Sequence, residues 1–160
     1  MIRQNLLHNY LIYSVAMLAL FFSTAHASGP SNQKSVQGIS IYLGVVPASV
    51  VIDHDPEHPE RKMHGGTPRD SHYEHVMVAL FDEQSGKRIT EAEVTAKVSR
   101  PGLQPIRKKL EPMAISGAMT FGNYFKMAED GTYRVEVKIS HPGKTGAVKA
   151  VFEHEHKYRH

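Results

Sequence analysis

The chain has 160 residues, and its 19 basic and 16 acidic side chains give a formal net charge of only +3. This balance, with a single short basic run at residues 107–109, argues against nucleic-acid binding. Eleven histidines and seven methionines occur without any cysteine, which excludes disulfide bonds and a lipoprotein anchor. The length is sufficient for one domain with its own core.

The N-terminal segment has the layout of a secretory signal peptide. Arg3 precedes a mostly apolar run over residues 11–22, and Ala25-His26-Ala27 follows with small residues at the cleavage positions. The run is shorter than the roughly 20 residues that span a bilayer. We therefore predict a signal peptide over residues 1–27, a periplasmic location and no membrane attachment after cleavage. Cleavage after Ala25 is the alternative, and it would leave His26 with a terminal amine that can chelate copper.

Two later stretches show no apolar period. Residues 28–37 are small and polar, and they predict a flexible leader before a folded domain over residues 38–160. Residues 39–43 then alternate as a first strand that continues loosely to Ile52. Residues 53–71 hold three prolines, two glycines and many charges, and they predict a long loop.

From His72 onward the sequence divides into short β segments separated by turn residues. Further strands are predicted near residues 72–81, 94–98, 105–111, 119–125, 133–139 and 147–156, with residues 105–111 placed at a sheet edge. No segment has a good helical pattern. About seven strands with turns roughly every 8–12 residues predict an all-β fold, an Ig-like antiparallel β-sandwich.

The histidines form two clusters. One runs from residue 54 to residue 75 beside Met63 and Met77, and the other closes the chain over residues 154–160. Imidazole suits copper and zinc, and thioether sulfur is a soft ligand suited to Cu(I). An exported protein of this composition is therefore expected to bind a metal ion, with copper as the first candidate and zinc as the second.

Strand alternation narrows the set of ligands. His154 and His156 share a strand face with Phe152, and His75 shares one with Met77. If the strand order brings these ends together, the metal ligands are predicted to be His75, His154 and His156, with Met77 or Met113 as a soft partner and His72 as a substitute. The alternative is that His154 is a hydrogen-bonded core histidine and that the methionines are core residues. The loop histidines would collect metal only weakly.

The sequence contains neither a nucleophile-elbow pattern nor a local triad signature, so we do not expect an enzyme. The predicted function is a periplasmic carrier or buffer of a metal ion, copper in the first place. The alternative is a metal-free interaction module that assists an envelope protein or a respiratory complex through a sheet edge or the 53–71 loop.

Two segments carry a resemblance to a known group of domains. They read VMVALFDEQSGKRITEAEV over residues 76–94 and GNYFKMAEDGTYRVEVKISHPG over residues 122–143. Residues 72–157 thereby resemble small exported bacterial β-sandwich domains of the YtkA-like and FixH-like kind. This resemblance implies the sandwich fold and a link to copper or to respiratory-oxidase assembly. Copper carriers of the CopC kind share the architecture, but this chain lacks their first-strand histidine unless cleavage exposes His26.

Overall fold

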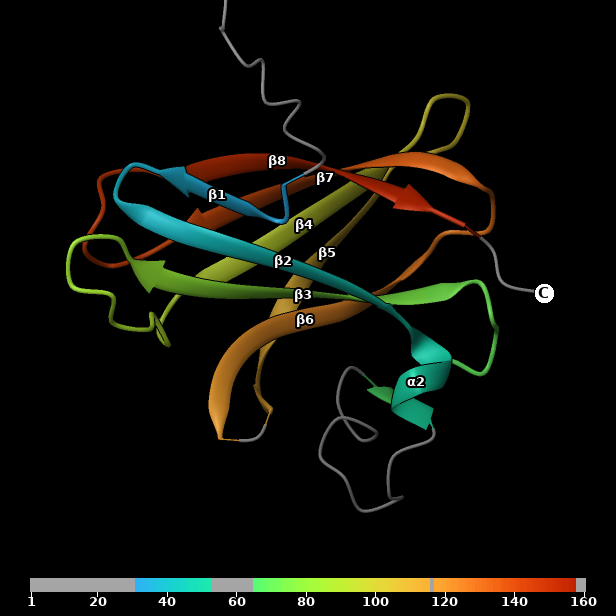
Figure 1. Ribbon diagram of the computed structural model, residues 1–160, viewed down its shortest axis with the longest axis horizontal. Helices are drawn as coiled ribbons and strands as arrows, with labels where there is room; N and C mark the ends of the chain where they lie inside the picture. Colours follow the sequence, from blue (N-terminus) through green and yellow to red (C-terminus); the bar gives the residue numbers. More distant parts are fainter. Residues whose placement is uncertain (1–30, 53–64, 116, 158–160) are drawn as a thin grey trace, which may run out of the picture.

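The computed structural model describes residues 31–52, 65–115 and 117–157, which form an antiparallel β structure (Figure 1). The expected all-β antiparallel fold is confirmed, with eight strands in place of about seven. The strands are β1 (Gln33–Val36), β2 (Ile39–Pro47), β3 (Tyr73–Asp82), β4 (Glu93–Ser99), β5 (Ile106–Ile115), β6 (Ala118–Lys126), β7 (Gly131–Ser140) and β8 (Val148–His156). One short helix, α2 (Ala48–Ile52), follows β2.

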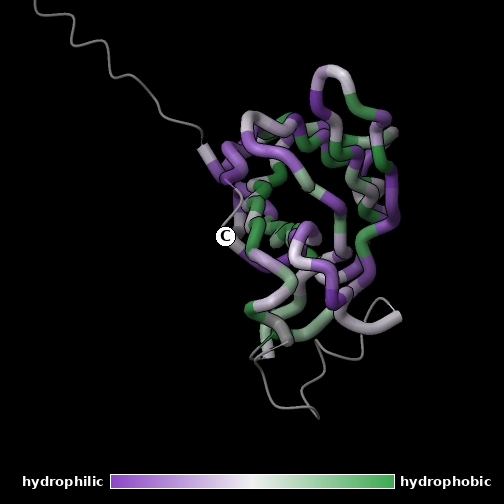
Figure 2. The backbone as a smooth tube through the Cα atoms, turned by 90° about the vertical axis from the view of Figure 1, so that its right-hand side faces the viewer, coloured by the Kyte–Doolittle hydropathy of each residue, from purple (hydrophilic) through white to green (hydrophobic). Residues whose placement is uncertain are grey.

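The strands follow the order β1-β2-β3-β6-β5-β4-β7-β8 and form two layers that share one strand. The first half of β5 pairs with β4 up to Leu110, and its second half pairs with β6 from Glu111 onward. The edge strands β1 and β8 approach each other, with Lys34 Nζ 5.7 Å from the centre of the Phe152 ring. Figure 2 looks along the strands and shows the sheet curled around an apolar interior, so the sandwich is nearly closed.

Alternating side chains build the core between the layers. In β7, Tyr133, Val135, Val137 and Ile139 are buried while Arg134 and Lys138 are exposed. The same period places the apolar residues of β3 and β4 inside. Because strand side chains alternate between faces, this burial fixes which residues of each strand lie on the outer surface.

The predicted leader over residues 28–37 is wrong over part of its length, because Gln33–Val36 form strand β1. Gln37 (φ 50°) and Gly38 (φ 77°) turn the chain back onto β2, as in hairpins whose two central residues have positive φ. The side chains of β1 are mostly exposed, so the strand is held by its backbone and has no apolar alternation to detect. Residues 28–30 lie outside the described residues.

In the strand order, the strand predicted at a sheet edge over residues 105–111 is internal, between β6 and β4. Ile106–Leu110 pair only with β4 and Glu111–Ile115 only with β6, so each half of β5 has one side without a strand partner among the described residues. Leu110 and Met113 of β5 are buried. The exposed Arg107, Lys109 and Glu111 make the strand look polar in the sequence, so this burial cannot be recognised there. The expected extension of the first strand to Ile52 is also wrong, since residues 48–52 form α2.

Several predictions fall on residues outside the described ranges. They include the signal peptide, residues 53–64 of the predicted loop with His54, His58 and His64, and the terminal His160. Among the described residues, no helix combines the length and the apolar character needed to cross a membrane.

Candidate metal site

His75 lies on the outer face of β3 and is nevertheless buried, with 1% of its surface exposed. Its neighbours Glu74 and Val76 occupy the other, inward face of the strand. Tyr124 of β6 covers His75, with the two rings stacked at a centroid distance of 4.7 Å. The Tyr124 hydroxyl in turn lies 3.2 Å from Thr67 Oγ1, in the segment that leads to β3. The imidazole is therefore held in a fixed position away from water.

A row of four residues crosses this outer face, one from each of β2, β3, β6 and β5. Gly44 is paired with Met77, Met77 with Gly122, and Gly122 with Glu111. Two of the four positions lack side chains, so neighbouring side chains lie directly over the backbone on either side of Met77. Glycine inside a strand often marks a place where another group approaches the backbone closely.

Gly122 is the point at which His75 and Met113 meet. A Cβ atom added there would lie 2.7 Å from Met113 Sδ and 2.8 Å from His75 Nε2, closer than real contacts allow. The imidazole nitrogen and the thioether sulfur therefore both border the same small space above a bare strand backbone. Met113 is 1% exposed, so this sulfur is also shielded from solvent.

Met77 adjoins the same space but turns away from it. Its terminal methyl would lie 3.4 Å from a Cβ at Gly44, on the β2 side of the row. Met77 is half-buried, and its long unbranched side chain has several rotamers. Glu111, across the ladder from Gly122, is exposed and is the acidic residue of the row.

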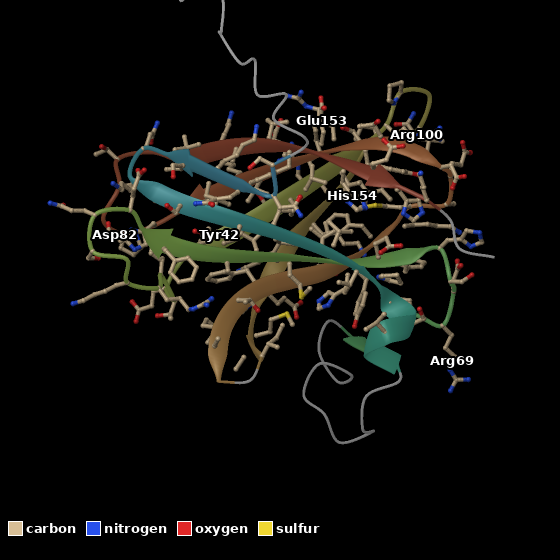
Figure 3. All side chains as sticks on the ribbon, viewed as in Figure 1. Tyr42, Arg69, Asp82, Arg100, Glu153 and His154 are labelled. Atoms are coloured by element: carbon tan, nitrogen blue, oxygen red, sulfur yellow. The ribbon has the colours of Figure 1, made fainter. Side chains whose placement is uncertain are left out.

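His154 and His156 form a second group at the end of β8. Both lie on the inward face with Phe152, as strand alternation predicts, and their ring centroids are 6.3 Å apart. His156 is 5% exposed, and its Nδ1 lies 3.5 Å from Glu74 Oε1. Figure 3 shows His154 and Asp82 toward opposite ends of the molecule.

His72 lies at the same end as His156, just before β3. Its backbone N–H donates to Asp70 Oδ1 at 3.0 Å, and its Nδ1 lies 2.6 Å from the same oxygen. These two hydrogen bonds lower the pKa of Asp70 to about 2. Electrostatic repulsion from His72 is one of the lesser causes that lower the pKa of His156.

Burial lowers the pKa of both His154 and His156. For His156, desolvation outweighs the opposing influence of Asp130 and of the Met127 backbone. For His154, desolvation is again the main cause, and the neighbouring His156 lowers the pKa further. Both shifts favour the neutral form of the imidazole, which is the form that binds metal ions.

The predicted ligands therefore separate into two groups on opposite faces of β3. His75 meets Met113 with Met77 beside them, while His154 and His156 lie near Glu74 and His72. Within residues 31–52, 65–115 and 117–157, no three or more His, Asp or Glu side chains are grouped closely enough to hold a metal ion. Sequence analysis missed Gly122 and Tyr124, although a glycine in the middle of an aromatic strand is a detectable signal.

Neither a protein-family model nor a curated protein matches the sequence. Solved structures do share the fold. A DUF4426 family protein from Pseudomonas aeruginosa has a TM-score of 0.62 and 15% identity, over 81% of this chain and 100% of that chain. A copper-bound variant of FetP from uropathogenic Escherichia coli has a TM-score of 0.60 and 15% identity, over 79% and 94%. A copper-bound variant of Campylobacter jejuni P19 has a TM-score of 0.63 and 14% identity, over 79% and 94%.

The chain thus shares its fold with bacterial proteins that have been crystallised with copper, and at these identities the likeness concerns the fold alone. The resemblance to YtkA-like and FixH-like domains stays a prediction.

Proposed function

We propose that this chain is a periplasmic copper-binding protein, a carrier or buffer of Cu(I), whose ion binds above Gly122 between His75 Nε2 and Met113 Sδ. The observation that carries the proposal is the convergence of these two atoms on one point, at 2.7 and 2.8 Å from the position that a Gly122 Cβ would occupy.

The spacing suits a bridging metal ion. Typical metal–nitrogen and metal–sulfur bonds of about 2.0 and 2.3 Å place the two donors roughly 4.3 Å apart in a linear arrangement. His75 Nε2 and Met113 Sδ both lie under 3 Å from the same point above Gly122, so an ion at that point would be within reach of both donors. The absence of a side chain at Gly122 provides the room that the ion needs.

The chemistry of the donors favours copper over zinc. Structural zinc sites use four ligands drawn from thiolate, imidazole and carboxylate, whereas thioether with imidazole is a combination suited to Cu(I). Both donors are almost fully buried, so water would not compete for the ion. Met77 is paired with Gly122 across the ladder. A change of its side-chain rotamer can bring its sulfur toward Gly122 and offer a third ligand to the ion during transfer.

The periplasmic location rests on the signal-peptide layout of residues 1–27. It agrees with the origin of a FetP structure of similar fold, whose protein was produced in the periplasm.

The test is Cu(I) uptake by the mature protein in competition with a chromophoric chelator, followed by X-ray absorption at the copper edge. The wild-type protein is expected to hold one ion with a sulfur neighbour. Met113→Leu should remove the sulfur signal and weaken that ion at least about tenfold, because the substitution conserves volume but lacks the donor.

Met119→Leu is the matched control, since Met119 is a partly buried methionine of β6 paired with Ala114. It should leave the sulfur signal intact. A wild-type protein without any sulfur-bound copper would overturn the proposal, and one that binds no copper at all would favour the metal-free interaction module.

A further inference from the structure

We infer that the end of the sandwich at His154 and His156 is a second metal site, which takes one Cu(I) ion between two imidazole nitrogens. The inference does not rest on the proposed function. It uses other residues, on the opposite face of β3, and it has its own readout.

The first argument is the spacing of the rings. A metal ion about 2.0 Å from each nitrogen, with the nitrogen about 1.1 Å from its ring centre, places two ring centroids up to roughly 6.2 Å apart. The centroids of His154 and His156 are 6.3 Å apart and their planes are inclined at 41°. The rings therefore approach the span of a two-coordinate ion before any movement, because they are two residues apart on one strand face.

The second argument is the state of the His156 nitrogens. Nε2 is fully buried and has no partner in good hydrogen-bonding geometry among the residues that the structure describes, although the Met127 backbone lies close enough to act on the same ring. A buried polar atom without a partner costs about 1–3 kcal/mol, and such atoms call for an explanation. Coordination of an ion through Nε2 would supply the missing partner.

The third argument is the surroundings of Nδ1, the other nitrogen of the same ring. It faces the buried carboxylate of Glu74 at 3.5 Å. Histidines that bind metals usually direct their second nitrogen at a carboxylate or a carbonyl, which fixes the ring and raises its basicity. Tyr133 packs its ring edge to face on His156 at 5.8 Å and restricts it further.

The ion that fits is Cu(I). With no group of three or more potential His, Asp or Glu ligands among the described residues, the site offers too few donors for zinc. Cu(I) accepts two imidazoles in a near-linear arrangement. His154 is half-buried and gives the ion a route from solvent to the buried His156.

The experiment uses the mature Met113→Leu variant, in which the sulfur-containing site is disabled. It should still take up one Cu(I) ion, with only light nitrogen or oxygen neighbours in the absorption spectrum. Adding His154→Ala should remove that ion. Adding His141→Ala should not, because His141 is equally half-buried but lies beyond the end of β7, away from His156.

The outcomes separate the two proposals. If Met113→Leu binds no Cu(I) while the wild-type protein binds one ion through sulfur, the second site is refuted and the proposed function stands. If the wild-type protein shows only a sulfur-free ion that His154→Ala removes, the proposed function fails and the second site stands. If the ion in Met113→Leu survives His154→Ala, it binds elsewhere and the inference is wrong.

Discussion

Gly122 has no side chain at a position where the neighbouring strand residues Phe121, Tyr124 and Phe125 are large and buried. We attribute to Gly122 the role of leaving room for the ion between His75 and Met113. We predict that Gly122→Ala abolishes the sulfur-bound copper although it removes no ligand, because the new Cβ would lie under 3 Å from both donor atoms. Copper uptake with absorption spectroscopy measures the effect, and circular dichroism checks the fold.

Gly44→Ala is the natural control for this variant. Gly44 pairs with Met77 from the opposite side, and a Cβ there would meet the Met77 methyl at an ordinary 3.4 Å. We expect Gly44→Ala to bind copper like the wild-type protein. Equal losses in both alanine variants would point to a general disturbance of the sheet, and no loss in either would show that the space above Gly122 is not used.

At the scale of the elements, β5 joins the two layers, and Leu110 lies where the strand changes partner. Leu110 is fully buried, and its backbone is the last of β5 to pair with β4. We predict that Leu110→Ala lowers the free energy of unfolding by about 2–5 kcal/mol, the usual range for a buried leucine. Leu103→Ala, in the exposed turn before β5, should change it by less than about 0.5 kcal/mol.

Chemical denaturation of the two leucine variants provides the measurement. Similar stabilities of Leu110→Ala and Leu103→Ala would mean that the shared strand does not hold the layers together. A fall confined to Leu110→Ala, with an unchanged dependence on denaturant, would locate the loss in the native packing.

The strands were predictable where one face is apolar and the other polar, as in β7 with Tyr133 and Ile139. The sequence could not reveal β1, whose side chains are exposed and whose stability comes from backbone pairing. It also could not reveal the change of partner in β5, because strand order depends on contacts distant in sequence. The polar side chains of β5, which has one unpaired side along each half, have the pattern of an edge strand.

The candidate site was predictable only in its parts. The sequence indicated His75, Met77 and Met113 as soft or borderline donors, and alternation correctly placed His154 and His156 with Phe152. Which donors meet depends on the pairing of β3 with β6 and of β6 with β5, and this pairing brings Met113 to His75. No local pattern carries that information.

At the scale of the whole molecule, the two layers meet at one end through a buried contact between acid and base. Glu74 belongs to β3 in one layer and His156 to β8 in the other, and both are almost fully buried. His154, His72, Asp130 and Tyr133 are further titratable groups around His156. The charge state of these few side chains therefore affects how the sandwich is held together.

The folded protein lowers the pKa of His154 and of His156 from 6.5, mainly by desolvation. Below pH 6.5 the unfolded chain then binds more protons than the folded one, so the free energy of unfolding must fall as the solution is acidified. The contribution of these histidines is fully present above pH 6.5 and is lost as the pH falls through their folded-state values. For each proton that the unfolded chain binds in excess of the folded one, the free energy of unfolding falls by about 1.4 kcal/mol per pH unit of acidification.

We expect metal-free wild-type protein to lose stability between pH 6.5 and about 5, before most carboxylates titrate. Urea denaturation at several pH values in the presence of a chelator measures this slope. Replacing His154 and His156 together by glutamine should flatten it, whereas His141→Gln should not, because His141 lies beyond the end of β7, away from the Glu74–His156 contact. A double variant with the wild-type slope would mean that other groups control the acid response and that the Glu74–His156 end does not sense pH.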